Sequence, residues 1–480
     1  MRKLPFSYES IREVYDKENR KGNVDLAILP TDYCDLIKTI HDKRLELSRL
    51  RKISTKKMDD DSRAAHYSLI SSMKDEIKDL CDLKENQLSE ILLDVERKIN
   101  DKSYFYKIER DENYYKKTGE ECFHTKGDSL ESMIMSKLLC LDLASSFKVK
   151  ASNRHHIMSC VKSLLVSDRS FVIIRTDIQS FFETIPHELV FQYVNGNPFV
   201  SKKTIGCIRS VLEQYDSIKF TGNIGIGVPR GIAISSYISE IIMRNFDMWL
   251  KSQPNVMFYA RYVDDIIIIL SHLISETTID NFFSEISTSI SKLGLNLHPQ
   301  GSSKSVLIDY NPNYGKRQTF EYLGYKIRLN PKNITFLLSD KRCARITSRI
   351  NNAFKYFESN YKKDPRKARI DLIDCLNLLS GNTGLHKSKF GVKTGLYFSN
   401  DLISEECEQL HKIQAFYIHC KVNRLSLEVN PFGDGAQKDA YLNRLKNKLI
   451  QINFVERWKK KTMFSFSVKR MKELSNILGE

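Results

Sequence analysis

The segment Phe258-Tyr-Ala-Arg-Tyr-Val-Asp-Asp-Ile-Ile-Ile-Ile-Leu270 carries most of the information about the fold of this chain. Apolar runs flank Val263 and two adjacent acids, Asp264 and Asp265, and this pattern predicts a β-hairpin with both acids at or beside its tip. Adjacent carboxylates repel each other, and neighbouring strand residues point to opposite faces. Solubility alone does not explain such a pair beside four isoleucines, whereas bound cations do.

Two other segments gain meaning beside this hairpin. In Phe171-Val-Ile-Ile-Arg-Thr-Asp-Ile-Gln-Ser-Phe-Phe-Glu-Thr-Ile-Pro-His187, a buried strand ends near Asp177 and two aromatic residues follow. Taken alone, Asp177 is more simply explained as the cap of a turn. In Gly225-Ile-Gly-Val-Pro-Arg-Gly-Ile-Ala-Ile-Ser-Ser236, a turn precedes an apolar helical pattern that continues through Trp249. Glycine at such a turn allows a close approach of the backbone to a ligand.

Together the acids of these segments fit the transfer of a nucleotidyl group. That reaction needs a nucleophilic 3′-hydroxyl and a phosphate whose added charge is neutralised, and two Mg²⁺ ions about 3.5–4 Å apart can provide both. Mg²⁺ prefers carboxylates and other oxygen ligands. We expect Asp177 and Asp264 to bridge two Mg²⁺ ions, for which Mn²⁺ can substitute. Asp265 would complete or orient the set, and the carbonyl of Ile178 would add a ligand.

These motifs resemble those of reverse transcriptases over residues 150–327. Tyr262-Val-Asp-Asp265 resembles the YxDD box, Asp177-Ile-x-x-Phe-Phe the first-acid motif, and Gly227-Val-Pro-Arg-Gly231 the G-x-P-Q-G loop. Gly294-Leu-Asn-Leu-His-Pro299 with Lys304 resembles the motif whose lysine lies near the triphosphate, and Phe320-Glu-Tyr-Leu-Gly-Tyr325 resembles the primer grip. The resemblance implies an α+β right-hand polymerase fold of fingers and palm, with a helical N-terminal insertion and a helical thumb and C-terminal domain.

The resemblance also implies residue roles, with Asp177, Asp264 and Asp265 as the catalytic acids. Phe182 stands where the family has a steric gate against the ribose 2′-hydroxyl, so DNA is the expected product; a core position is the alternative, because Phe181 is adjacent. Arg154, assisted by Lys150, would grip the triphosphate, with a surface ion pair as the alternative. The other residues implied at the nucleotide are Arg230, Gly231, Tyr262 and Lys304. Arg230 departs from the family's usual glutamine and adds a charge there.

Composition agrees with a nucleic-acid partner. Of the 480 residues, 75 are Lys or Arg and 59 are Asp or Glu, which leaves a net charge of +16 and favours a polyanion, either nucleic acid or an acidic membrane surface. The stretch 33–100 lacks Gly and Pro and predicts two or three long helices, with the charged run 51–63 as a linker. Aromatic residues in 103–128 suggest short strands. We expect three regions, 1–128, 129–328 and 329–480, the last helical with an interruption at 380–397.

Cysteine usage and hydropathy predict the compartment. The ten cysteines include no CxxC pair, which favours reduced core residues in a cytosolic protein. No apolar stretch approaches the roughly 18 residues of a membrane span, and the N-terminus lacks the apolar core of a signal peptide. We therefore expect a cytoplasmic protein with no membrane partner.

The regions outside the palm motifs resemble the bacterial defence-associated reverse transcriptases, a group that includes abortive-infection polymerases. The segments concerned are Lys117–Glu120, Leu379–His386, Lys393–Asn400 and Trp458–Phe466. The resemblance implies antiphage defence with a noncoding RNA as template, dNTPs as substrates, a DNA product, and a second reverse-transcriptase subunit or a homo-oligomer. Three alternatives stay open: template-independent or protein-primed DNA synthesis by the same site, a catalytically silent nucleic-acid-binding scaffold, and an RNA polymerase.

Overall fold

The structure is a computed structural model that describes residues 4–55, 58–127, 129–150, 152–167, 169–220, 222–271, 276–313, 316–331, 333–384 and 393–479. The chain divides into two units, each with its own internal packing. Unit 1 comprises Met1–Lys150 and Ser180–Arg244, and unit 2 comprises Ala151–Gln179 and Asn245–Glu480. Both units draw on more than one of the regions 1–128, 129–328 and 329–480 that the sequence suggests.

Unit 1 is mainly helical. Its helices are α1 (Tyr8–Lys21), the 3₁₀ turn η1 (Leu26–Ile28), α2 (Thr31–Leu50), α3 (Asp60–Asn100), α4 (Glu112–Thr118), α5 (Leu130–Phe147), α7 (Phe181–Thr184), α8 (His187–Gly196), α9 (Lys202–Ile218) and the first part of α10 (Ala233–Lys251). Two short antiparallel strands, β1 (Ile108–Arg110) and β2 (Phe123–Thr125), pair with each other. The prediction of strands in 103–128 is confirmed for these two.

That prediction was wrong for Tyr114 and Tyr115, which lie in helix α4. The side chain of Asp111 accepts a hydrogen bond from the Tyr114 amide at the start of this helix, and Gly119 ends it with a φ of 74°. Local capping therefore decides the conformation of this aromatic segment.

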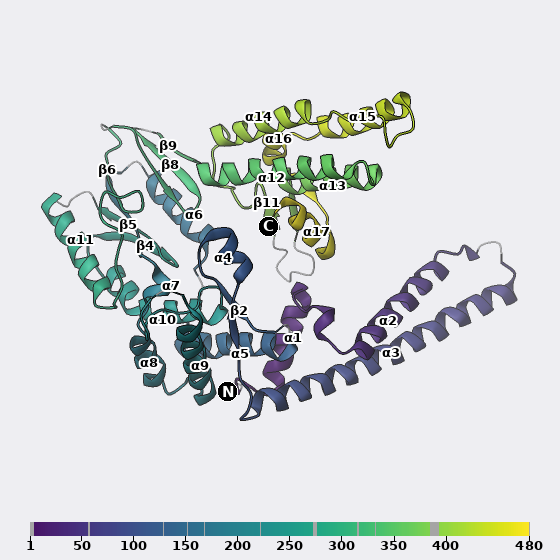
Figure 1. Ribbon diagram of the computed structural model, residues 1–480, viewed down its shortest axis with the longest axis horizontal. Helices are drawn as coiled ribbons and strands as arrows, with labels where there is room; N and C mark the ends of the chain where they lie inside the picture. Colours follow the sequence, from purple (N-terminus) through teal and green to yellow (C-terminus); the bar gives the residue numbers. More distant parts are fainter. Residues whose placement is uncertain are drawn as a thin grey trace. The chain divides into compact units, whose positions relative to one another are not determined.

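The long helices predicted in 33–100 are α2 and α3, which run antiparallel and side by side (Figure 1). Buried Leu47, Met73 and Ile77 form a small apolar cluster of their own, with Leu50, Ile70 and Cys81 packed against it. The side chain of Asp59 accepts a hydrogen bond from the Ser62 amide and caps the start of α3.

Unit 2 contains a four-stranded antiparallel sheet in the order β4-β5-β3-β6. Its strands are β3 (Phe171–Asp177), β4 (Val256–Tyr262), β5 (Asp265–Ser271) and β6 (Val306–Tyr310), and α6 (Arg154–Leu165) and α11 (Glu276–Ser291) belong to the same unit. The predicted hairpin is confirmed as β4 and β5. Residues 266–270 of β5 are all buried, which explains the unbroken apolar run.

A second antiparallel sheet and a set of helices complete unit 2. The sheet comprises β7 (Gln318–Tyr322), β8 (Tyr325–Asn330) and β9 (Asn333–Leu338). The helices are α12 (Asp340–Asn360), α13 (Pro365–Ser380), α14 (Glu408–Asn423), α15 (Gly435–Ile450), α16 (Phe454–Lys459) and α17 (Val468–Leu478). One apolar core runs from Ile173 and Ile267 in the first sheet through Phe354 in α12 to Leu474 in α17. The strands β3 and β5, which carry Asp177 and Asp265, therefore pack against one continuous apolar core.

The interruption predicted in the C-terminal helical region is a small sheet of β10 (Asn382–Gly384), β11 (Lys393–Gly395) and β12 (Met463–Phe464). Residues 385 and 386 of the segment 379–386, which resembles defence-associated enzymes, lie outside the described residues. All ten cysteines are free thiols. Across the described ranges, every helix falls short of the length and apolarity that crossing a bilayer requires.

Candidate active site

The β4–β5 hairpin turns through only Val263 and Asp264, because Tyr262 and Asp265 are already paired across it. Val263 has a φ of 62°. A β-branched residue avoids this region, and such strain of about 1–3 kcal/mol is typical of functional sites. Beneath the turn, buried Arg261 donates a 2.8 Å hydrogen bond to the Val263 carbonyl and forms a 2.8 Å ion pair with Asp247. This arginine fixes the strained turn that presents the two acids.

The end of β3 brings the third acid to the same place. Asp177 lies directly opposite Asp265 in the antiparallel register, and the Ile178 amide donates a 3.1 Å hydrogen bond to the Asp264 carbonyl. On the other side, His298 N–H donates to the Asp177 carbonyl at 3.0 Å. The isolated bridge between Ile178 and Leu297 uses the backbone groups of their neighbours, so it does not engage the Ile178 carbonyl. Asp177, Asp264, Asp265 and that carbonyl are thus brought together.

Cationic side chains already contact two of the acids. Arg175 Nη2 lies 2.7 Å from Asp265 Oδ1, and Lys304 Nζ lies 2.7 Å from Asp177 Oδ2. His298 Nε2 is 3.7 Å from the same Asp177 oxygen. The resemblance placed Lys304 near the triphosphate, and the structure places its ammonium group on an acid of the site. Internal cations therefore balance part of the charge here.

Burial raises the pKa of Asp265 to about 6. Arg175 opposes this shift, whereas the charges of Asp177 and Asp264 add to it. Nearby, the hydroxyl of buried Tyr322 has no hydrogen-bond partner among the described residues. Burial also raises the pKa of Tyr322, and the charge of Asp265 adds to that shift. The site thus concentrates negative charge that Arg175 only partly offsets.

This donor set fits a hard divalent cation. It consists of carboxylate and carbonyl oxygens, which Mg²⁺ and Mn²⁺ prefer. In the part of the chain that the structure describes, no three His, Cys, Asp or Glu side chains are already gathered around a metal position. Instead, Arg175 contacts one oxygen of Asp265 and Lys304 contacts one oxygen of Asp177. Asp177, Asp264 and Asp265 would hold the metal.

The Gly225–Gly231 loop belongs to unit 1, where residues of α8 and α9 hold it. His187 Nε2 lies 2.6 Å from the Gly227 carbonyl, and the Asp216 carboxylate accepts a 2.9 Å hydrogen bond from the Gly225 amide. Burial opposes ionisation of Asp216, but hydrogen bonds from Lys219 and the Gly225 amide outweigh it and lower its pKa. The loop is therefore held in a defined conformation before any ligand arrives.

Glycine is required at the end of this loop. Gly231 has a φ of 97°, and a Cβ atom there would lie 2.4 Å from the Phe123 carbonyl oxygen and 2.6 Å from Cys122 Sγ. The neighbouring Arg230 is exposed and pairs with Glu120 at 3.0 Å. The positive charge of Arg230, which departs from the family pattern, is thus paired with an acid of the same unit.

Phe182 and Phe181 differ in burial. Phe181 is buried, whereas Phe182 is half-buried and its carbonyl accepts a 2.7 Å hydrogen bond from the Val228 amide. Phe181 therefore fills the core position, and Phe182 keeps an accessible face beside the Gly225–Gly231 loop. Lys150 is exposed. These residues belong to unit 1, whereas the three acids belong to unit 2.

Arg154 lies at the β7–β8 turn of unit 2. Its Nε donates a 2.7 Å hydrogen bond to the Leu323 carbonyl, and its guanidinium lies 5.0 Å from the centre of the Tyr325 ring. One terminal nitrogen is buried and has no partner within the described ranges. The side chain is thus anchored on the β7–β8 turn, and this buried nitrogen is left without a hydrogen bond within those ranges.

Sequence reasoning gave no site role to Arg175, Tyr322, His298, His187 or Asp216. Arg175 carried a usable signal, because residues two apart in a strand share a face and it precedes Asp177 by two. The others reach their sites through turns and pairings that local patterns do not reveal.

Comparison with known proteins assigns part of the chain. Residues 122–327 match the family model described as reverse transcriptase (RNA-dependent DNA polymerase). This part is a reverse-transcriptase domain, a nucleotidyltransferase domain of the RNA-directed DNA polymerase class, and the expected mixed helix-and-sheet polymerase fold is confirmed. No curated protein matches the chain with significance.

Among solved structures, the chain is similar to telomerases of two yeasts. Apo telomerase from Candida tropicalis has 15% identity and a TM-score of 0.34, with 72% of this chain and 57% of that chain covered. Candida albicans telomerase in complex with a fragment of telomeric RNA has 13% identity and a TM-score of 0.33, with 72% and 53% covered. A C-terminally truncated Candida tropicalis telomerase has 18% identity and a TM-score of 0.31, with 42% and 44% covered. The chain thus spans about half the length of these proteins, and such low scores do not extend the assignment beyond the matched domain.

Proposed function

We propose that this chain is an RNA-directed DNA polymerase of the bacterial defence-associated kind, which copies a noncoding RNA into DNA during antiphage defence. The observation that carries the polymerase part is the pairing of Asp177 with Asp265 across β3 and β5, with Asp264 bonded to Ile178 at the same strand end. The matched reverse-transcriptase domain, residues 122–327, contains all three acids.

Each residue of the proposed site has a definite task. Bound Mg²⁺, with Mn²⁺ as a substitute, would supply charge neutralisation at the phosphate and favour ionisation of the 3′-hydroxyl. Asp265 holds a proton below a pH of about 6 and must lose it to act as a ligand. Arg175 and Lys304 balance the acids until the cation is held. Preorganised charges of this kind account for much of the rate enhancement in phosphoryl transfer.

Substrate choice in this proposal depends on Phe182 and Arg154. The accessible face of Phe182 would exclude a ribose 2′-hydroxyl, which makes dNTPs the substrates and DNA the product. Arg154 would donate from its guanidinium to a triphosphate oxygen, because a planar guanidinium suits phosphate geometry.

The biological part of the proposal has separate support. The segments Lys117–Glu120, Lys393–Asn400 and Trp458–Phe466 resemble bacterial defence-associated enzymes, and the net charge of +16 suits an RNA partner. The proposal includes a cytoplasmic bacterial location, and a second reverse-transcriptase subunit or a homo-oligomer as a further partner.

The test is dNTP incorporation by the purified full chain with Mg²⁺, on a primed RNA template and on the RNA that copurifies. Asp264→Asn should abolish synthesis, whereas Asp280→Asn, which removes an exposed carboxylate in α11, should not. Product that ignores the sequence of the added RNA would replace the proposal with template-independent synthesis. A lack of any incorporation by wild type would leave a nucleic-acid-binding scaffold.

Sugar selection is tested separately. Phe182→Ala should admit NTPs, and Phe199→Ala, which truncates an exposed phenylalanine of the same unit, is the matched control. A wild-type preference for NTPs, unchanged in Phe182→Ala, would indicate an RNA polymerase instead.

A further inference from the structure

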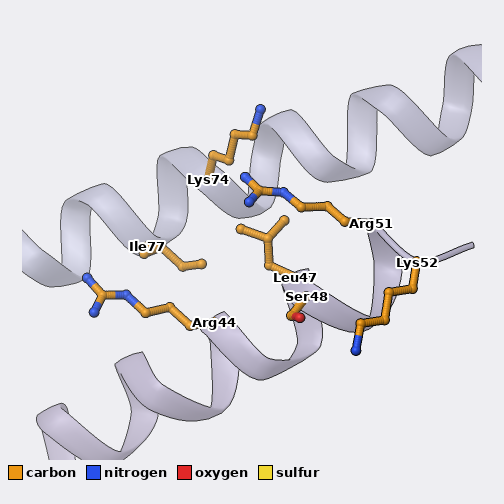
Figure 2. A pocket seen from close by; sticks show the side chains of 7 residues that line it. All are labelled: Arg44, Leu47, Ser48, Arg51, Lys52, Lys74 and Ile77. Carbon is orange, nitrogen blue, oxygen red and sulfur yellow. The ribbon is translucent and has the colours of Figure 1, made fainter. Parts of the chain in front are cut away.

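The α2–α3 hairpin of unit 1 holds a basic cleft. It has a volume of about 520 Å³ and is lined by Arg44, Leu47, Ser48, Arg51, Lys52, Lys74 and Ile77. Figure 2 shows Arg51 extending across the gap toward α3 and Lys74 rising from α3 beside it, while Arg44 extends from α2 and Lys52 from the turn that follows α2. The lining contains four cationic side chains and no carboxylate.

The floor of the cleft is apolar and joins the two helices. Leu47 and Ile77 face each other between the helices and are 8% and 9% exposed (Figure 2). With Met73 they form the apolar cluster that joins α2 to α3. Lys and Arg beside such a cluster pack their aliphatic stems on it and leave their charges at the rim. The cluster therefore sets the spacing of the cations.

Several other cations of this hairpin pair with carboxylates. Lys43 pairs with Glu76 at 2.8 Å, Lys38 pairs with Asp35 at 2.8 Å, and Arg63 pairs with Asp60 at 2.9 Å. By contrast, no carboxylate within the described ranges pairs with any of the four cations of the cleft, although Arg44 donates to Cys81 Sγ at 3.3 Å. Gathering four like charges without counter-charges raises the free energy of the hairpin, and a bound polyanion would lower it.

The spacing of these cations indicates the kind of anion. Arg44 and Arg51 are seven residues apart, which corresponds to about 10 Å along a helix, so the cleft can contact successive phosphates rather than one small ion. The guanidinium groups of Arg44 and Arg51 suit phosphate oxygens. The lining contains no aromatic side chain on which a base could stack. These features indicate contacts with a backbone and little reading of bases.

We propose that this cleft binds the sugar–phosphate backbone of RNA, as a second nucleic-acid site in addition to the polymerase site. The phosphate chemistry rests on the cleft itself, whereas the choice of RNA over DNA rests on the proposed function. In this role the hairpin holds a part of the RNA that is not being copied.

The test compares two variants that lose the same charge. The cleft variant combines Arg44→Ala, Arg51→Ala, Lys52→Ala and Lys74→Ala. The control removes four cations of the same hairpin that pair with carboxylates: Lys38→Ala, Lys43→Ala, Arg63→Ala and Arg97→Ala. Binding of a labelled 40-nucleotide RNA, and of DNA of the same sequence, is measured against salt concentration in EDTA without dNTPs. Circular dichroism melting checks that both variants fold.

Each phosphate contact contributes about 0.7 to the slope of log K against log salt for a single strand, so losing four should lower it by up to about 3. We expect this loss for RNA in the cleft variant, a change below about 1 in the control, and a similar loss for single-stranded DNA, because the contacts are to phosphates. Equal losses in the two variants, or no loss in the cleft variant, would each overturn the proposal, and a loss for DNA without one for RNA would overturn the choice of RNA. Because the assay needs no synthesis, wild type that binds RNA through the cleft yet incorporates no dNTP would refute the proposed function alone.

Discussion

Replacing Asp265 with asparagine should change how stability depends on pH. In the wild type, burial and the charges of Asp177 and Asp264 raise the pKa of Asp265 from its ordinary value of 3.8 to about 6, despite Arg175. Asparagine keeps the size of the side chain and an oxygen that can accept from Arg175, but it does not titrate. The comparison therefore isolates the free-energy cost of ionising this carboxyl group in the folded protein.

The size of this free-energy cost follows from the shift of about two units in the pKa of Asp265. At about 1.4 kcal/mol per unit, ionisation of Asp265 costs the fold about 3 kcal/mol, or 2–3 after allowance for its 20% exposure. Between pH 4 and 6 the folded state holds a proton that the unfolded state has released. The stabilising contribution is thus complete below pH 4 and is lost as the pH rises through about 6. The free energy of unfolding of Asp265→Asn, minus that of wild type, should rise by about 2 kcal/mol between pH 4.5 and 7.5.

The assay is urea unfolding in EDTA from pH 4.5 to 7.5, followed by tryptophan fluorescence. Both tryptophans, Trp249 and Trp458, belong to unit 2, so the signal reports the unit that holds the acids. Asp280→Asn, which removes an exposed carboxylate of α11, is the control for the loss of a carboxyl group. Arg175→Gln should extend to higher pH the range in which wild-type stability falls, because Arg175 lowers the pKa of Asp265. A flat or falling difference for Asp265→Asn would refute the reasoning.

Three further predictions concern the same sites. Gly231→Ala should destabilise unit 1 by about 2 kcal/mol or more in thermal unfolding, because its Cβ would lie 2.4 Å from the Phe123 carbonyl oxygen at a φ of 97°. Val263→Gly should cost less than about 0.5 kcal/mol in urea unfolding, or should stabilise, because relief of the strain at a φ of 62° offsets the entropy of glycine. Mg²⁺ at ten times its Kd should stabilise wild type by about 1.4 kcal/mol in thermal unfolding and should leave Asp177→Asn nearly unchanged.

The parts of the fold that sequence predicts well are those that local patterns determine. The β4–β5 hairpin follows from apolar runs on either side of a polar turn, and α2 and α3 follow from helical spacing without Gly or Pro. The aromatic segment around Tyr114 shows the opposite case. Aromatic residues favour strands, but the cap at Asp111 and the turn at Gly119 impose a helix.

The candidate site divides in the same way. The three acids were identifiable because the motifs that carry them occur in a recognisable order. The ion pairs of Arg175 and Lys304 were not, because they depend on strand register and on the path of the chain between residues 298 and 304. The boundaries of the two units, at 150, 179 and 244, coincide with no Gly- or Pro-rich linker. They follow from packing between distant segments, which local sequence does not encode.

The two charged sites of this chain should respond differently to salt. At the acids, Arg175 and Asp265 are 13% and 20% exposed, so dissolved ions screen their interaction weakly. At the α2–α3 cleft, the four cationic side chains are exposed, and binding of a phosphate backbone there releases counterions. Between 50 and 200 mM salt, RNA binding through the cleft should fall by about 50-fold for four contacts. The stabilisation by Mg²⁺ at one fixed Mg²⁺ concentration should fall by much less. Parallel loss of both would mean that the acids are as open to solvent as the cleft, which contradicts their burial.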